Sequence, residues 1–160
     1  MLYYFGLPGS SEAQRILDIV SKKRILVVDD DVVVVNRLSA KLKASGFEVV
    51  LAMDGSEAVS AVRHARPDLI LLDITFPPDV AHGGGVAWDG FLIIQWLRRM
   101  DEVKDVPIIV ITGGDSAKYK DKALAAGAVD FFHKPIDHDA LVAVIRKILG
   151  EDAPAPGAAP

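Results

Sequence analysis

The sequence predicts an α/β fold: a doubly wound, five-stranded parallel sheet with helices on both faces. Five short apolar segments alternate along the chain with five segments of helical periodicity, and there is no internal repeat. The apolar run 69–72 is unbroken, which is typical of a strand covered on both of its faces. Parallel neighbours need right-handed crossover helices, so the alternation and the unbroken run predict the same architecture.

Length and composition predict one globular domain. The chain has 160 residues, of which 51% are hydrophobic and 25% are charged, and this composition excludes a mainly disordered chain. No apolar run reaches the roughly 18 residues that a membrane span needs, and the apolar opening 1–8 lacks the basic segment of a signal peptide. The net charge of −4, without a basic cluster, argues against direct nucleic-acid binding. We therefore expect a cytoplasmic protein.

The absence of cysteine limits the chemistry of any site. Because the sequence has no cysteine, disulfides, thiolate zinc sites and thiol nucleophiles are excluded. The four histidines are scattered and lack metal-ligand spacing. A metal would therefore have to be held by oxygen ligands or by a single histidine.

The segment 1–23 is predicted to be an N-terminal extension with a short helix. Ser11 and Gln14 have the spacing of a capping box. One face of this helix is apolar and consists of Ala13, Ile16, Leu17 and Val20. This face must be buried on the domain or against a second copy of the chain. We expect a monomer or a weak homodimer.

The main domain begins with two pairs of a strand and a helix. Strands are predicted at 24–28 and 47–52, and helices at 32–45 and 54–66. Residues 32–35 are four valines, which favour a strand locally. However, Val35, Leu38 and Leu42 recur at helical spacing, and Gly46 suits a helix stop. The second segment is therefore predicted to be a helix.

The second half of the chain continues the alternation. Strands are predicted at 69–73, 107–112 and 129–133, and helices at 90–99, 115–127 and 137–150. The irregular stretch 74–89 is longer than most connections between a strand and a helix. The tail 151–160 is rich in alanine and proline and is predicted to be an unstructured linker or end.

Polar residues stand at the carboxyl ends of four predicted strands, where sheets of this kind bind ligands. They are Asp29, Asp30, Asp73, Thr112 and Lys134. Three carboxylates within roughly 5 Å would repel by about 3 kcal/mol per pair at an effective dielectric near 20, so we expect a cation among them. Oxygen ligands favour Mg²⁺. A neighbouring lysine and hydroxyl can stabilise a phosphoryl group that is transferred to an Asp carboxylate.

Four motifs, in this order, resemble the receiver domain of two-component response regulators. They are Ile25–Asp31, Asp68–Asp73, Pro107–Thr112 and Lys134–Pro135, and the similarity covers about 24–150. The resemblance implies a flavodoxin-like sheet with strand order 2-1-3-4-5. It also implies a phosphoacceptor signalling domain of a phosphorelay rather than an enzyme, with autocatalytic phosphotransfer and autodephosphorylation only.

The same resemblance implies roles for the residues of the site. Asp73 would accept the phosphoryl group. Mg²⁺ would be held by Asp29, Asp30 and Asp73, with the main-chain carbonyl of Thr75. Lys134 would pair with the phosphoryl group.

The resemblance further implies a switch and two kinds of partner. The Thr112 hydroxyl would move to the phosphoryl group while Phe131 turns inward. This would change the face made by the domain's fourth helix, fifth strand and fifth helix, to which a downstream protein would bind. The donor would be a sensor histidine kinase or a histidine phosphotransfer protein.

Other readings of the same residues stay open. Asp30 or Asp31 can be a helix cap, and Phe131 can be an ordinary core residue. A Mg²⁺-dependent phosphatase of the haloacid-dehalogenase type also uses a strand-end Asp, but it needs a second Asp where Thr75 stands. A flavodoxin-like cofactor binder is disfavoured by the acids. A receiver-like module that acts without phosphorylation is the remaining alternative.

The chain departs from the family pattern directly after the strand that carries Asp73. About nine extra residues lie within the segment 76–88, which makes the connection unusually long. We expect this insertion to cover part of the site and to control access by water or a phosphatase.

Overall fold

The computed structural model describes residues 12–13, 15–17, 22–75 and 90–151. The strands are β1 (Arg24–Val28), β2 (Glu48–Ala52), β3 (Leu69–Asp73), β4 (Ile108–Thr112) and β5 (Asp130–His133). The helices are α2 (Val32–Ala44), α3 (Gly55–Ala65), α4 (Gly90–Leu97), α5 (Ser116–Ala126) and α6 (His138–Leu149). The predicted strands and helices of the domain are confirmed, and their ends differ from the prediction by one or two residues.

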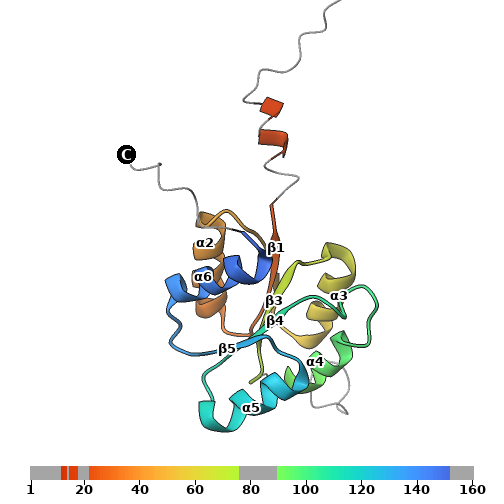
Figure 1. Cartoon of the computed structure of the whole chain (residues 1–160), viewed down its shortest axis with the longest axis vertical. Coiled ribbons are helices and arrows are strands. Elements are labelled where there is room, and N and C mark those ends of the chain that lie inside the picture. Colours follow the sequence, from red (N-terminus) through yellow and green to blue (C-terminus); the bar gives the residue numbers. More distant parts are fainter. Residues whose placement is uncertain (1–11, 14, 18–21, 76–89, 152–160) are drawn as a thin grey trace, which may run out of the picture.

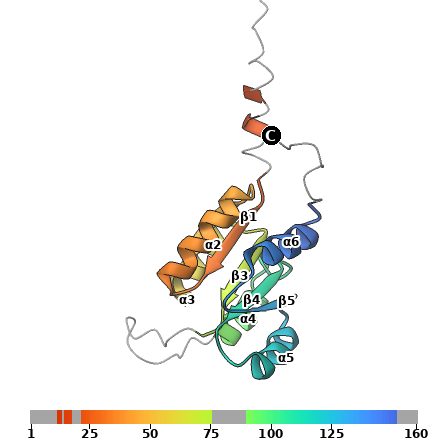
Figure 2. The ribbon, with the colours of Figure 1, turned by 90° about the vertical axis from the view of Figure 1, so that its left-hand side faces the viewer.

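The five strands form one parallel sheet in the order β2-β1-β3-β4-β5, which confirms the predicted fold. One face packs against α2 and α6, and the other packs against α3, α4 and α5. Both views show α5 and α6 on opposite sides of β5 (Figure 1, Figure 2). Every residue of β3 and β4 is buried, so the centre of the sheet is a rigid support for the residues that follow these strands.

The valine-rich segment forms the predicted helix, α2. Asp31 caps it by accepting hydrogen bonds from the N–H groups of Val33 and Val34. Val35 is buried at 2% exposure, whereas Val33 is 58% exposed. The helical spacing of the buried residues therefore outweighs the local strand preference of the valines. The helix ends at Ala44, and Gly46, which follows the capping residue Ser45, has a φ of 94° that suits a glycine.

The N-terminal extension is helical at the described residues 12–13 and 15–17. Ile16 and Leu17 are 54% and 60% exposed, so these two side chains do not pack on the sheet domain. Packing against a second copy stays a prediction. The predicted capping box, the insertion 76–88 and the tail from 152 lie outside the described residues. In the part of the chain that is described, no helix has the length and apolar character of a membrane span.

Candidate functional site

Three acidic side chains meet at the carboxyl edge of the sheet, as predicted. Asp73 ends β3, and Asp29 and Asp30 follow β1, which pairs with β3 so that Val28 lies beside Leu72. One carboxylate oxygen from each of the three Asp residues lies within 4.8 Å of the others. Asp29 and Asp73 are buried at 2% and 3% exposure, whereas Asp30 is exposed.

Lys134 contacts two of these carboxylates from the end of β5. Its Nζ donates to Asp29 Oδ2 at 2.7 Å and to Asp73 Oδ2 at 3.0 Å. Burial raises the pKa of the Asp29 carboxyl above its usual range, against the lowering effect of the hydrogen bond from Lys134. Burial by itself would lower the pKa of the Lys134 ammonium, but its hydrogen bonds to Asp29 and Asp73 outweigh this, and the pKa is raised. Lys134 is therefore held in its charged form.

Backbone groups fix the orientation of both buried carboxylates. The Asp31 N–H donates to Asp29 Oδ1 at 2.8 Å. Asp73 Oδ1 accepts from the Thr75 N–H at 2.9 Å and from the Thr75 hydroxyl at 2.7 Å. The Oδ2 atoms of both Asp residues therefore face Lys134. The sequence did not predict that Thr75 holds Asp73, although an Asp whose carboxylate accepts from the backbone N–H two residues on is a recognised turn.

Thr112 and Phe131 lie on neighbouring strands, β4 and β5. Thr112 is fully buried, and its Oγ1 accepts a hydrogen bond from the Gly114 N–H at 3.1 Å. Phe131 is partly buried against the core beneath α3, α4 and α5, and its strand partner is Val110. In this structure the Thr112 hydroxyl therefore satisfies a backbone group, and the switch roles of both residues stay predictions.

The donor set of the acidic cluster suits a hard divalent cation. Its members offer carboxylate oxygens only, and the exposed Asp30 leaves the cluster open to solvent on one side. Mg²⁺ is commonly held by one or two carboxylates while water or phosphate oxygens fill the remaining positions. The residues present therefore fit Mg²⁺.

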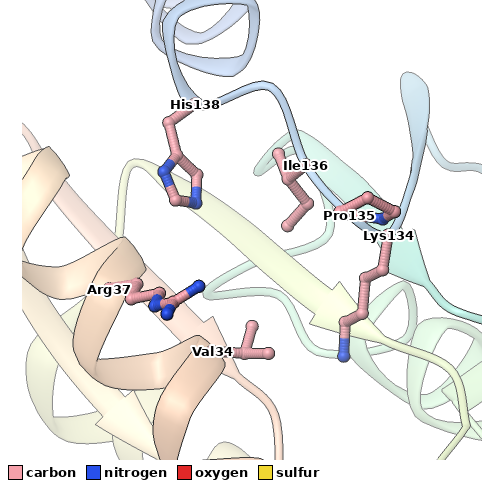
Figure 3. Close-up of a pocket in the computed structure, with 6 residues that line it drawn as sticks. All are labelled: Val34, Arg37, Lys134, Pro135, Ile136 and His138. Carbon is pink, nitrogen blue, oxygen red and sulfur yellow. The ribbon is translucent and has the colours of Figure 1, made fainter.

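A pocket that sequence reasoning missed lies beside Lys134. It has a volume of about 360 Å³ and lies between α2 and the β5–α6 connection (Figure 3). Its lining residues are Val34, Arg37, Lys134, Pro135, Ile136 and His138. Val34 and Ile136 give it an apolar wall, and Arg37 points into the space between α2 and His138 (Figure 3). The lining residues come from two segments, 34–37 and 134–138, that are far apart in the sequence, so no local sequence pattern predicts the pocket.

Comparisons of sequence agree with this geometry. The sequence model of the response regulator receiver domain matches residues 25–146. Transcriptional regulatory protein PrrA of Mycobacterium tuberculosis is 39% identical over 130 residues, which cover 81% of this chain and 51% of that protein. Response regulator MprA of Mycolicibacterium vanbaalenii is 37% identical over 135 residues, which cover 84% of this chain and 54% of that protein. The chain thus spans about half the length of the curated relatives it matches.

Solved structures show the same fold. Chemotaxis protein CheY4 of Vibrio cholerae matches with a TM-score of 0.70 at 27% identity, over 80% of this chain and 99% of that chain. The receiver domain of a sensor histidine kinase from Pseudomonas aeruginosa PAO1 has a magnesium ion coordinated in its active site cleft. It matches with a TM-score of 0.69 at 28% identity, over 81% of this chain and 99% of that chain.

The chain belongs to the response regulator receiver family. A phosphoacceptor role in two-component signalling fits both the family and the site. Receiver domains are generally not catalytic enzymes, and the phosphatase alternative is not favoured.

Proposed function

We propose that Asp73 accepts a phosphoryl group from a phosphohistidine of a sensor histidine kinase or a histidine phosphotransfer protein. The observation that carries this proposal is the setting of Asp73. Its carboxylate is buried at the end of β3, lies 3.0 Å from the Lys134 ammonium, and belongs to a cluster of three acids. A buried acid with a cation and further acids around it suits a nucleophile at which negative charge accumulates.

The transfer step needs little chemistry from the protein. A carboxylate oxygen of Asp73 attacks phosphorus, the phosphorus–nitrogen bond breaks, and the imidazole leaves with the electron pair. Lys134 already binds Asp73 Oδ2 and offsets the negative charge on the phosphoryl oxygens. Thr75 holds Asp73 Oδ1 and so limits the orientations of the carboxylate.

Asp29, Asp30 and Asp73, with the main-chain carbonyl of Thr75, are the residues that would hold Mg²⁺. When bound, Mg²⁺ offsets the charge of the carboxylates and of the phosphoryl oxygens. Support comes from the clustering of the three carboxylate oxygens within 4.8 Å. Burial raises the pKa of Asp29, as expected for an anion that lacks a full set of positive partners.

Thr112 and Phe131 form the proposed switch. The family's fourth helix, fifth strand and fifth helix correspond here to α5, β5 and α6, and this face would bind the downstream protein. Support comes from position: Thr112 is buried at the end of β4, and Phe131 lies partly buried on the next strand. A hydroxyl that moves toward Asp73 would leave its present partner, the Gly114 N–H.

The pocket beside Lys134 is the proposed contact for the donor protein. Lys134 lines the pocket and also binds Asp73, so a donor protein that contacts the pocket would lie beside the phosphoacceptor. Arg37 has no ion pair or hydrogen bond among the described residues. Charge complementarity therefore favours an acidic side chain of the donor, placed near its phosphohistidine.

The first experiment measures phosphorylation of the whole chain. Treatment with a small phosphodonor and Mg²⁺ should add one acid-labile phosphoryl group to the intact mass. The group should be absent after chelation of Mg²⁺ and in Asp73→Ala. Labelling that persists in Asp73→Ala would overturn the assignment.

A second experiment distinguishes binding of the donor protein from the phosphoryl transfer to Asp73 itself. In Arg37→Glu, phosphotransfer from a cognate phosphohistidine protein should slow by about tenfold, while labelling by a small phosphodonor stays unchanged. Arg63→Glu, an equal charge change at an exposed position of α3, is the matched control. Equal rates for the two variants would remove the pocket from the docking surface without affecting the role of Asp73.

A further inference from the structure

Gly114 lies at the meeting point of β4, β5 and α5. Its N–H donates to Thr112 Oγ1 at 3.1 Å, and its carbonyl accepts from His133 Nε2 at 3.0 Å. Because a carbonyl only accepts, His133 must carry its proton on Nε2. Both peptide groups that flank Gly114 are therefore held, one by the end of β4 and one by the end of β5.

The ring of Tyr119 packs directly against Gly114. A Cβ at position 114 would lie 2.6 Å from Tyr119 Cε2, so the aromatic ring covers the glycine directly. The ring of Tyr119 also packs near that of Phe91 on α4, with 6.0 Å between the ring centroids. Only glycine lets the ring come this close, and Tyr119 thereby ties the connection after β4 to two helices.

We propose that His133 and Tyr119 are positioning residues that hold Gly114, and through it the Thr112 hydroxyl, in the unphosphorylated arrangement. The inference rests on the proposed function, because it takes Thr112 as the group that moves when Asp73 is phosphorylated. Thr112 Oγ1 cannot approach Asp73 without either losing the Gly114 N–H or carrying Gly114 with it. If Gly114 moves, the His133 bond and the Tyr119 contact must change as well.

The contacts of His133 and Tyr119 with Gly114 raise the free energy that is needed to reach the switched state. Interactions present in one state and lost in the other bias the equilibrium toward the first state. A ligand that favours the switched state therefore binds more weakly while His133 and Tyr119 are in place. His133 is exposed, so the hydrogen bond can be removed without opening the core.

The test measures binding of beryllofluoride, a phosphoryl mimic, to the whole chain in the presence of Mg²⁺. His133→Ala should bind beryllofluoride about three- to tenfold more tightly, which matches the typical net strength of one hydrogen bond. The affinity for Mg²⁺ alone should not change, because no described contact of His133 reaches the acidic cluster. A general loss of structure would not separate the two affinities in this way.

Three further variants sharpen the test. His133→Gln keeps a donor at this position and should restore the weaker affinity, whereas His64→Ala, on α3, should have no effect. Tyr119→Phe keeps the ring and should resemble the wild type. Unchanged or weaker beryllofluoride binding in His133→Ala would overturn the inference. If the wild type binds no beryllofluoride and accepts no phosphoryl group, the proposed function itself fails.

Discussion

The carboxyl and amino edges of the sheet carry charge in opposite ways. At the carboxyl edge, three carboxylates gather and two of them share one ammonium, that of Lys134. At the amino edge, the guanidinium Nε of Arg24 lies 3.0 Å from Glu48 Oε1. The main-chain N–H of Arg24 donates to Asp68 Oδ2 at 2.7 Å. One edge thus concentrates like charges, and the other pairs opposite ones.

Arg98 completes the amino edge. Its guanidinium donates to the carbonyls of Lys104, Val106 and Gly127, at 2.9, 2.7 and 2.8 Å. These carbonyls belong to the segments that lead into β4 and β5, so one guanidinium joins both segments. The difference between the edges shows where the fold is stabilised by paired charges and where it keeps unbalanced negative charge that suits a cation.

The largest effect is expected from removing the ammonium of the carboxyl edge. Lys134→Met leaves two buried carboxylates without their cation and should lower the free energy of unfolding by about 3 kcal/mol in the absence of Mg²⁺. Added Mg²⁺ should restore part of the loss, because it binds only the folded chain. Denaturant unfolding with and without Mg²⁺ measures both values. A loss below that of an ordinary surface substitution would show that the two carboxylates need no cation.

Removing the anchor of the amino edge should have the next largest effect. Arg98→Met abolishes three hydrogen bonds from a charged donor and should cost about 2 kcal/mol in stability, whether or not Mg²⁺ is present. Arg99→Met, the exposed neighbour, is the control and should change stability by less than about 0.5 kcal/mol. Equal effects of the two substitutions would contradict the anchoring role.

A smaller effect of opposite sign is expected from Asp30. Asp30→Asn removes one of three like charges and should raise the metal-free unfolding free energy by about 1 kcal/mol. The same substitution should remove most of the stabilisation by Mg²⁺. Asp121→Asn gives an equal charge change at an exposed position of α5 and serves as the control. If Asp30→Asn destabilises the metal-free protein, repulsion among the three carboxylates does not lower its stability.

The smallest effect belongs to an exposed pair between α2 and α6. Lys41 Nζ lies 2.5 Å from Asp139 Oδ1, and this hydrogen bond lowers the pKa of the Asp139 carboxyl. A lowered carboxyl pKa stabilises the fold above the unfolded pKa, and the contribution disappears as the pH falls through the folded pKa. The stability difference between wild type and Asp139→Asn should therefore be small at neutral pH and vanish in acid. A difference that grows in acid would have the wrong sign.

The sequence predicted the parts of the molecule that depend on local pattern and parallel topology. The apolar runs and the glycine at position 46 located the strands and the first helix stop. Because carboxyl ends of parallel strands meet at one edge, Asp29, Asp73 and Lys134 could be brought together from their positions alone.

Other features depend on side-chain packing between distant segments. The pocket beside Lys134 lies between α2 and the β5–α6 connection. The contacts of Gly114 link β4, β5 and α5. No periodicity or spacing encodes such contacts. Ile16 and Leu17 remain exposed in the single chain, so of the two predicted ways of burying their apolar face only packing against a second copy stays a prediction.

The most direct test of the central claim is the chemical location of the phosphoryl group. After phosphorylation with Mg²⁺, borohydride reduces an aspartyl phosphate to homoserine, which peptide mass spectrometry can place in the sequence. The site predicts homoserine at position 73 only, and none when Asp73→Asn is treated in the same way. Homoserine at position 29 or 30, or a phosphorylated chain without homoserine at position 73, would contradict the assignment of Asp73.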